Sequence, residues 1–308
     1  MMLDLVRPWA AFFGLVILLF TVDLLFGSRG TNLRMATLWS AIWVGAGLAF
    51  GLWIWASQGS EVAAAYYAAY LLEKSLSVDN IFVFVLIFSE LRIPAHQQHR
   101  ILLLGVVGAL LMRAVMIGFG VYLLQRFHWV IYPFAALLLV AAARLLFGES
   151  TERRLVKESC AACSTWVAKL IPVTPVGEGQ RFVLRQSGKL VATPMLVALI
   201  LIETTDLIFA LDSIPAVLAI TRDPYIVYTS NIFALLGLRA LYFVLADVVQ
   251  RFHYLRAGLA VILCFVACKM LLAGTIDISV TVSLGVIIAI VLAAVIASWA
   301  FPKREQEK

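Results

Sequence analysis

The organisation of this chain is clearest in two segments, Glu73-Lys-Ser-Leu-Ser-Val-Asp79-Asn80 and Asp206-Leu-Ile-Phe-Ala-Leu-Asp212-Ser213. Each segment places two acidic residues six positions apart inside a long run of mainly apolar residues, near 62–89 and near 192–220. An ionisable side chain costs about 2.5–3.5 kcal/mol to insert at the centre of a membrane helix. Two such segments therefore indicate a membrane protein with a polar interior that serves a function.

The rest of the chain has the composition of a membrane protein. Of its 308 residues, 63% are hydrophobic and 14% are charged, whereas soluble domains average about 45–50% apolar and about 25% charged residues. Runs of about 20 apolar residues can cross a hydrocarbon core about 30 Å thick as helices. Nine such runs predict an all-α polytopic fold, and they lie near residues 9–27, 36–56, 62–89, 99–124, 129–147, 192–220, 225–249, 257–273 and 278–301. The first run lacks a clear cleavage site, so we expect a retained helix rather than a signal peptide.

The distribution of Lys and Arg predicts the orientation, because short cytoplasmic loops hold an excess of basic residues. The links after the first, third, fifth and seventh runs and the C-terminal tail hold most of them, whereas the other side holds only Arg7, Arg126 and Arg222. This predicts an outside N-terminus and a cytoplasmic C-terminus. The net charge of +6 is explained by this bias and needs no nucleic-acid partner.

A cytoplasmic linker is expected over residues 148–191. Two β-prone runs around Gln-Ser-Gly, within 181–192, predict a small hairpin there. The linker also holds Cys160-Ala-Ala-Cys163. This spacing allows a zinc or redox role, although a pair of reduced thiols is the favoured interpretation.

An internal repeat relates the two acidic segments. The offset from 73 to 206 equals that from 79 to 212, and Arg113 corresponds to Arg239 at a slightly shorter offset. Gln125-Arg-Phe-His128 recurs as Gln250-Arg-Phe-His253. Because each unit holds three helices, the two copies enter the membrane from opposite sides and form an inverted pair, an arrangement that places substrate near the midplane.

The repeat predicts the division of the chain. The expected parts are peripheral helices at 1–60, a first three-helix repeat at 61–147, the linker at 148–191, a second repeat at 192–273, and a last helix with a basic tail at 274–308.

The candidate metal ligands are acidic side chains deep in the third and sixth apolar runs. They are Glu73, Asp79, Glu203, Asp206 and Asp212. Acids six apart on a regular helix point about 120° from one another, so convergence requires a distortion. Pro215 is expected to supply it, because its ring removes a backbone hydrogen bond and clashes with the carbonyl of Leu211.

The neighbouring residues favour a hard cation. Asn80 and Ser213 add neutral oxygens, and neither His nor Cys lies in the cluster. Such an all-oxygen shell suits Mn²⁺, Ca²⁺ or Mg²⁺ better than Zn²⁺ or Cu⁺. Five acids against Lys74, Arg113 and Arg239 leave two excess negative charges, which one dication would neutralise. Crowded carboxylates also favour protonation of an empty site, so we expect metal to exchange for protons.

The alternative is that these acids and bases are structural ion pairs that hold the helices together. Such pairs would explain Arg113 and Arg239, but not the surplus of acids or their repetition. An intramembrane enzyme using paired aspartates is less favoured, because repetition on both halves suits a passage better than a one-sided catalytic centre. We therefore expect a transporter and not an enzyme, with no permanently bound cofactor.

The sequence resembles the TerC family, particularly its Alx-like members. The resemblance rests on the first acidic segment, on Glu203-Thr-Thr-Asp206-Leu-Ile-Phe-Ala-Leu-Asp212-Ser-Ile-Pro215-Ala, and on Thr229-Ser-Asn231-Ile-Phe-Ala-Leu-Leu-Gly-Leu-Arg239. It implies a multi-pass bacterial inner-membrane protein of the LysE superfamily, with Mn²⁺ efflux as its activity and a link to tellurium resistance. By the same motifs, the five acids are the implied metal-site positions, and Asn231 joins the supporting residues. The resemblance also admits a membrane scaffold in a stress-response or protein-insertion complex, with protein partners that the sequence does not name.

Overall fold

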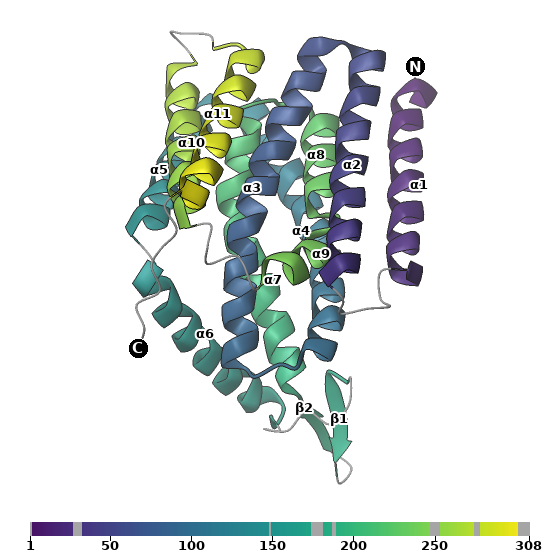
Figure 1. The fold of residues 1–308 in the computed structure, drawn as a ribbon, viewed down its shortest axis with the longest axis vertical. Coiled ribbons are helices and arrows are strands. Elements are labelled where there is room, and N and C mark those ends of the chain that lie inside the picture. Colours follow the sequence, from purple (N-terminus) through teal and green to yellow (C-terminus); the bar gives the residue numbers. More distant parts are fainter. Residues whose placement is uncertain are drawn as a thin grey trace.

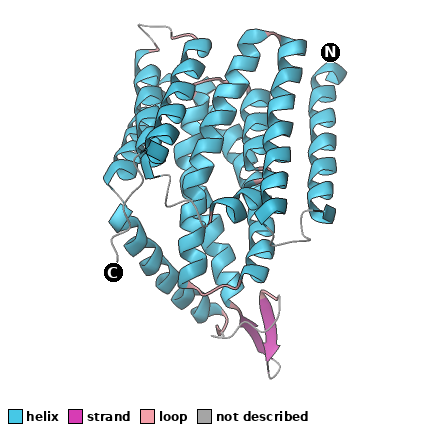
Figure 2. Cartoon of the chain, viewed as in Figure 1, coloured by secondary structure: helices cyan, strands magenta, loops and turns pink. Residues whose placement is uncertain are grey.

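A computed structural model describes residues 2–26, 33–147, 149–173, 181–186, 189–246, 253–273 and 278–300. These residues form eleven α-helices, one short 3₁₀ helix and a two-stranded hairpin (Figures 1 and 2). The helices are α1 (Met2–Phe26), α2 (Leu33–Gln58), α3 (Ser60–Glu90), α4 (Ala95–Arg126), α5 (Ile131–Phe147), α6 (Glu149–Leu170), α7 (Pro194–Leu218), α8 (Pro224–Leu235), α9 (Leu238–Leu245), α10 (His253–Leu272) and α11 (Val280–Ala300). The 3₁₀ helix η1 covers His128–Val130, and the strands are β1 (Val183–Gln186) and β2 (Lys189–Ala192).

The chain is an all-α polytopic membrane protein. Each of the nine expected runs coincides with a helix, except that the seventh is divided into α8 and α9. Among the described residues, α2, α4, α7, α10 and α11 are each long and apolar enough to cross a membrane, and the bent pair α8 and α9 is a sixth candidate span. The apolar stretches of α1 and α5, Pro8–Val22 and Ile131–Leu146, are shorter. Helix α3 has 31 residues, about 46 Å at 1.5 Å per residue, and carries the first acidic segment.

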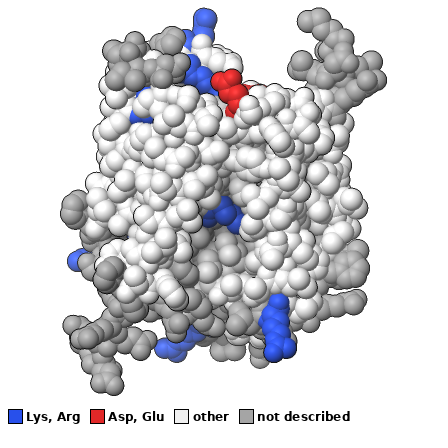
Figure 3. All heavy atoms as spheres, turned by 45° about the horizontal axis from the view of Figure 1, so that its top comes forward, with Lys and Arg blue, Asp and Glu red and all other residues white. Residues whose placement is uncertain are grey.

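The outer surface matches this assignment. Large apolar side chains are exposed on many helices, among them Leu111, Phe119 and Trp299, of which Trp299 is 87% exposed. The face drawn in Figure 3 is mostly uncharged, and most of its Lys and Arg atoms lie toward its two ends. Large apolar side chains on the protein surface are expected where the helices face lipid rather than water.

The helices pack in three main pairs: α3 with α8, α4 with α7, and α5 with α10. Helix α3 also contacts α7, α2 and α11. Small residues allow close approach in two of these contacts, since a Cβ at Gly105 in α4 would lie 3.1 Å from Ile202 in α7, and one at Gly47 in α2 would lie 2.8 Å from Tyr70 in α3. Short interhelical distances of this kind are a common basis of helix association in membranes.

The break between α8 and α9 lies at Leu236 and Gly237. The two helices meet at a bend of 42°, and Gly237 adopts a φ of 82°. This left-handed conformation favours glycine because it lacks a Cβ. A Cβ at this position would also lie 2.5 Å from the Cβ of Trp43 in α2. Glycine is therefore required twice here, once by the backbone angle and once by the neighbouring helix.

Pro215 lies within a continuous helix. Helix α7 continues through Pro215 to Leu218, and the Ala219 N–H donates to the Pro215 carbonyl. A helix can pass through proline when neighbouring helices support it. The distortion expected beside Asp212 therefore does not divide α7, whereas the span formed by α8 and α9 is divided.

The segment between α5 and α7 contains a helix that was not predicted from the sequence. Helix α6 packs against α3 and α7, with Cys160 and Val167 buried in their contact. Strands β1 and β2 pair antiparallel in the register Val183↔Ala192, within the segment where a hairpin is expected. The hairpin lies at the end of the molecule where α3 ends and α7 begins (Figures 1 and 2).

The hairpin is fastened to both neighbouring helices. The Ala192 N–H donates to the Pro172 carbonyl at 2.8 Å, just after α6. The Thr193 hydroxyl donates to the carbonyls of Arg181 and Phe182 at 2.9 and 3.1 Å, just before α7. The end of α6, the hairpin and the start of α7 are thus joined by hydrogen bonds.

Some predicted features lie outside the described residues. They are the second Gln-Arg-Phe-His mark at residues 250–252, the link at 27–32, part of the linker at 174–180, and the basic tail at 301–308.

Candidate ion site

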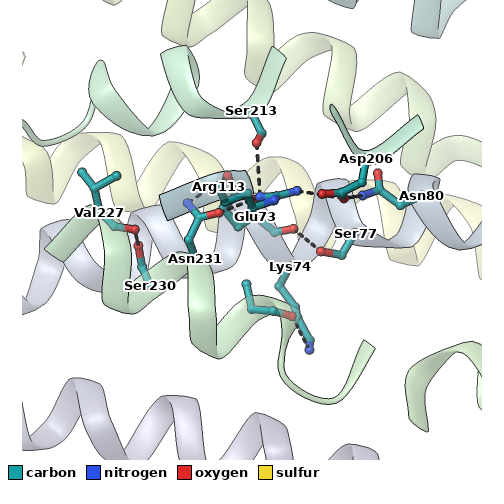
Figure 4. Close-up of polar contacts among 11 residues, drawn as sticks. Glu73, Lys74, Ser77, Asn80, Arg113, Asp206, Ser213, Val227, Ser230 and Asn231 are labelled. Carbon is teal, nitrogen blue, oxygen red and sulfur yellow. Dashed lines mark hydrogen bonds and ion pairs between the residues drawn. The ribbon is translucent and has the colours of Figure 1, made fainter. Parts of the chain in front are cut away.

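The centre of the site is Arg113, a buried residue of α4. Its Nη1 donates to Glu73 Oε2 of α3 at 2.5 Å and to Asn231 Oδ1 of α8 at 2.6 Å. Its Nη2 lies 3.4 Å from Asp206 Oδ1 of α7, and Nη1 lies 3.4 Å from Ser213 Oγ. Figure 4 shows these side chains converging on the guanidinium group. One arginine therefore joins four helices.

The network is closed by two amides. Asn231 Nδ2 donates to Glu73 Oε1 at 3.2 Å, so this amide contacts both the acid and the arginine. Asn80 Nδ2 donates to Asp206 Oδ1 at 3.5 Å. Removal of one partner from a buried charge pair typically costs about 3–5 kcal/mol, because the other charge stays buried without compensation. The charged and amide groups of these helices therefore stabilise the fold only when all of them are present.

Two oxygen atoms in this network could accept a further hydrogen bond or bind a cation. Asp206 Oδ2 and Asn80 Oδ1 are buried and have no hydrogen-bond donor among the residues that the structure describes. Buried acceptors are almost always satisfied by protein, ordered water or an ion. A carboxylate oxygen and an amide oxygen are also the ligands that hard divalent cations prefer.

A cavity of about 690 Å³ lies beside this network. Asp79 and Asn80 of α3, Arg113 of α4, and Asp212 and Ser213 of α7 all line it. The other lining residues, from α5, α6, α7 and α10, are mostly apolar and include Leu145, Leu155, Phe209 and Leu263. The cavity therefore brings together acids and neutral oxygens from α3 and α7.

Each of the two cavity acids faces an arginine. Asp79 Oδ1 lies 2.8 Å from Arg256 Nε of α10, and the same guanidinium group lies over the Phe82 ring at 4.1 Å from its centroid. Arg144 of α5 lines the cavity together with Asp212. Neither arginine is in the charge count expected from the sequence, because Arg144 lies near the end of the fifth apolar run and Arg256 lies just before the eighth.

Glu203 and two of the predicted bases lie elsewhere. A Cβ at Gly108 in α4 would come within 2.0 Å of Glu203 Oε1, so the carboxylate lies directly against that glycine. Arg239 Nη1 contacts His99 Nε2 at 3.0 Å. Lys74 Nζ donates to the backbone carbonyls of Ala234 and Leu236 at 3.1 and 3.4 Å.

The five acids thus do not form one cluster. Among the described residues, no group of three or more His, Cys, Asp or Glu side chains is arranged to hold a metal ion. The expected surplus of two negative charges falls to one, because Glu203 leaves the count of acids, while Arg144 and Arg256 replace Lys74 and Arg239 among the three bases. The network and cavity hold four acids and three arginines, a net charge of −1 with all ionised: Glu73, Asp79, Asp206, Asp212, Arg113, Arg144 and Arg256.

The family of the chain follows from comparison with known sequences. The model of the TerC integral membrane protein family matches residues 58–306, a range that contains the network and the cavity. The chain belongs to the TerC family. The matched residues include helices α3 to α11.

Two relatives that match most of the chain are also membrane proteins. The chain is 44% identical over 293 residues to an uncharacterized membrane protein of Myxococcus xanthus, a match that covers 94% of this chain and 91% of that protein. It is 40% identical over 289 residues to the Escherichia coli K12 protein named "Putative membrane-bound redox modulator Alx", with 90% of this chain and 89% of that protein covered. No solved structure matches the chain.

Burial favours the protonated form of both thiols of α6. Burial, with a smaller contribution from the charge of Glu90, raises the pKa of Cys160 to about 11. Burial also raises the pKa of Cys163, and both cysteines are free thiols. Reactive cysteines need a lowered pKa, because the thiolate is the nucleophile.

Proposed function

We propose that this TerC protein transports a divalent cation across the bacterial inner membrane, with Mn²⁺ as the expected ion and efflux as the expected direction. The observation that carries the proposal is a pair of buried oxygens, Asn80 Oδ1 and Asp206 Oδ2, that have no hydrogen-bond donor in the described part of the chain. Asn80 lines the cavity together with Asp79 and Asp212, and Asp206 accepts a hydrogen bond from the Asn80 amide. A passing cation would find carboxylate and amide ligands there without having to remove an existing hydrogen bond.

The ligand set supports a hard cation. The side-chain oxygens at the cavity come from Asp, Asn and Ser, and its lining contains no His or Cys among the residues that the structure describes. Mn²⁺, Mg²⁺ and Ca²⁺ prefer such oxygen ligands, whereas Zn²⁺ and Cu⁺ prefer nitrogen and sulfur. A net charge of −1 favours a cation over an anion. Protonation of a cavity acid after the cation leaves would couple cation exit to proton entry.

The packing of the helices supports an inverted repeat. In the proposed repeat α3 is equivalent to α7, α4 to the pair α8 and α9, and α5 to α10. If each helix is replaced by its equivalent, the pair α3 and α8 becomes the pair α7 and α4, which is also observed. The pair α5 and α10 becomes the pair α10 and α5, which is the same pair. The three main helix pairs are therefore reciprocal, as a two-fold axis in the membrane plane requires.

Transport by reconstituted protein is the direct test. The chain is inserted into liposomes that contain a Mn²⁺-sensitive dye, a Mn²⁺ gradient is imposed, and the wild type is compared with Asp206→Asn and Asp212→Asn. We expect uptake by the wild type and at least tenfold slower uptake by both variants. Glu158→Gln serves as the control, because Glu158 is exposed on α6 in a surface pair with Arg154.

Two results would count against the proposal. One is wild-type flux of Mn²⁺, Mg²⁺ and Ca²⁺ equal to that of empty liposomes. The other is normal manganese tolerance of cells that carry Asp79→Asn or Asp212→Asn at normal protein levels, which would favour the scaffold. A parallel series with an imposed pH gradient tests the coupling, since indifference to the gradient would remove the proton from the mechanism.

A further inference from the structure

The break between α8 and α9 creates a group of carbonyls that need a positive partner. Helix α8 ends at Leu235, and Gly237 turns the chain before α9 begins at Leu238. The last carbonyls of a helix have no intrahelical donor, and the helix dipole adds a partial negative charge at this end. Inside a membrane each unsatisfied backbone group costs several kcal/mol.

Lys74 supplies that partner from another helix. Its Nζ, on α3, donates to the carbonyls of Ala234 and Leu236 on the two sides of Leu235. Figure 4 shows Lys74 directed away from Arg113, whereas the adjacent Glu73 is directed toward it. An ammonium group has three N–H donors and no acceptor, so it is suited to a group of carbonyl oxygens.

Carbonyls at a helix break bind small cations in other membrane proteins. In secondary transporters with discontinuous helices, unwound carbonyls and half-helix C-terminal ends coordinate the coupling cation. The break in this chain offers the same chemistry, but here the positive charge is attached to the protein.

We propose that Lys74 is a built-in cation that fills a monovalent-cation site at the α8–α9 break. The site consists of the carbonyls of Ala234 and Leu236 and the negative end of α8. The wild-type chain therefore needs no small monovalent cation at this position. Removal of the ammonium group leaves a site that ammonium, K⁺ or Na⁺ fills from solution.

The test measures thermal stability of the purified full chain in detergent, so it does not depend on transport activity. Lys74→Ala is compared with the wild type in chlorides of ammonium, potassium, sodium and N-methylglucamine at equal ionic strength. N-methylglucamine is too large for the site. Lys189→Ala is the matched control, because Lys189 is exposed on β2 and its loss removes a charge far from the break.

We expect Lys74→Ala to melt at a lower temperature than the wild type in N-methylglucamine chloride. At least one small cation should raise that temperature by about 4 °C or more, with a saturating concentration dependence. The wild type and Lys189→Ala should show no dependence on the identity of the cation. If the protein shows this cation-dependent stability but no cation flux in liposomes, the proposed transport is contradicted while the Lys74 site is still supported.

Two results overturn the proposal. One is a Lys74→Ala melting temperature that is the same in all four salts. The other is a wild type that is itself stabilised by a small cation at the same concentrations. If Lys74→Ala does not yield folded protein in N-methylglucamine chloride, it is extracted in ammonium chloride. Monodisperse protein in that salt supports the site, and aggregation in every salt contradicts it.

Discussion

Arg113 shows how a single side chain organises the polar interior. Its guanidinium group contacts Glu73, Asp206, Asn231 and Ser213, which belong to three other helices. Arginine suits this position because its donors lie in a rigid plane and its charge is permanent. A lysine would lack the second nitrogen, Nη2, with which Arg113 contacts Asp206 in addition to the Glu73 and Asn231 contacts of Nη1.

Replacement of Arg113 should destabilise the protein strongly. We expect Arg113→Met to lower the free energy of unfolding by about 3–5 kcal/mol, because Glu73 and Asp206 would remain buried without their counter-charge. Denaturant titration in detergent, followed by circular dichroism, measures the change. Arg154→Met on the exposed face of α6 should cost only about 0.3–0.5 kcal/mol. Equal effects of the two variants would show that the network contributes no more than a surface pair.

The residue types of the site were predictable from sequence, but their partners were not. The acids and the oxygen-bearing neighbours stand out because polar residues are costly in apolar runs. The partner of Asp79 is Arg256, near the start of α10. In the sequence, Arg256 falls in the link after the seventh apolar run, where basic residues are expected to be cytoplasmic. Which base meets which acid depends on how the helices are placed, and residue spacing along one helix carries no information on that.

The thiols of α6 give a prediction that depends on pH. In a variant that keeps Cys160 but lacks the other three cysteines, we expect alkylation by iodoacetamide to be slow at pH 7. Its rate should rise about tenfold per pH unit toward pH 11, because the raised pKa of Cys160 keeps the thiol protonated until then. Mass spectrometry of quenched samples measures the rate. Modification at pH 7 as fast as that of a free cysteine would contradict a buried thiol.

At the scale of the helix, the bend between α8 and α9 depends on one glycine. We expect Gly237→Ala to lower the free energy of unfolding by more than the about 1–2 kcal/mol that a left-handed residue costs, since the new Cβ would also clash with Trp43. Thermal unfolding in detergent measures this effect. Gly45→Ala in α2 is the control, because nothing lies within 4 Å of a Cβ there, and it should be neutral or slightly stabilising.

Helix positions were more predictable than helix breaks. Nine apolar runs located nine helical regions, because length and hydropathy are sufficient for a membrane span. The break fell in the seventh run rather than at Pro215, since neighbouring helices support α7 while Gly237 and Lys74 stabilise the bend in α8 and α9. Helix α6 was missed because it is amphipathic and charged, and its apolar side is recognisable only against α3 and α7.

For the whole molecule, we expect the hairpin end to face the cytoplasm. In a cysteine-free background, Gln186→Cys in β1 should react with a membrane-impermeant maleimide only after the cells are opened. Trp129→Cys, in the link between α4 and α5, should react in intact cells. Both positions are exposed, so a difference reports the side of the membrane rather than burial. The reverse pattern would invert the orientation predicted from the basic residues.

The hairpin also links two helices that line the cavity. It joins the end of α6 to the start of α7, and α6 lines the cavity with Leu155 and α7 with Asp212. A displacement of the first turn of α7 would therefore also displace the end of α6. If the proposed transport requires such a displacement, we expect a substitution that weakens the hairpin hydrogen bonds to change the transport rate although no acidic residue is altered.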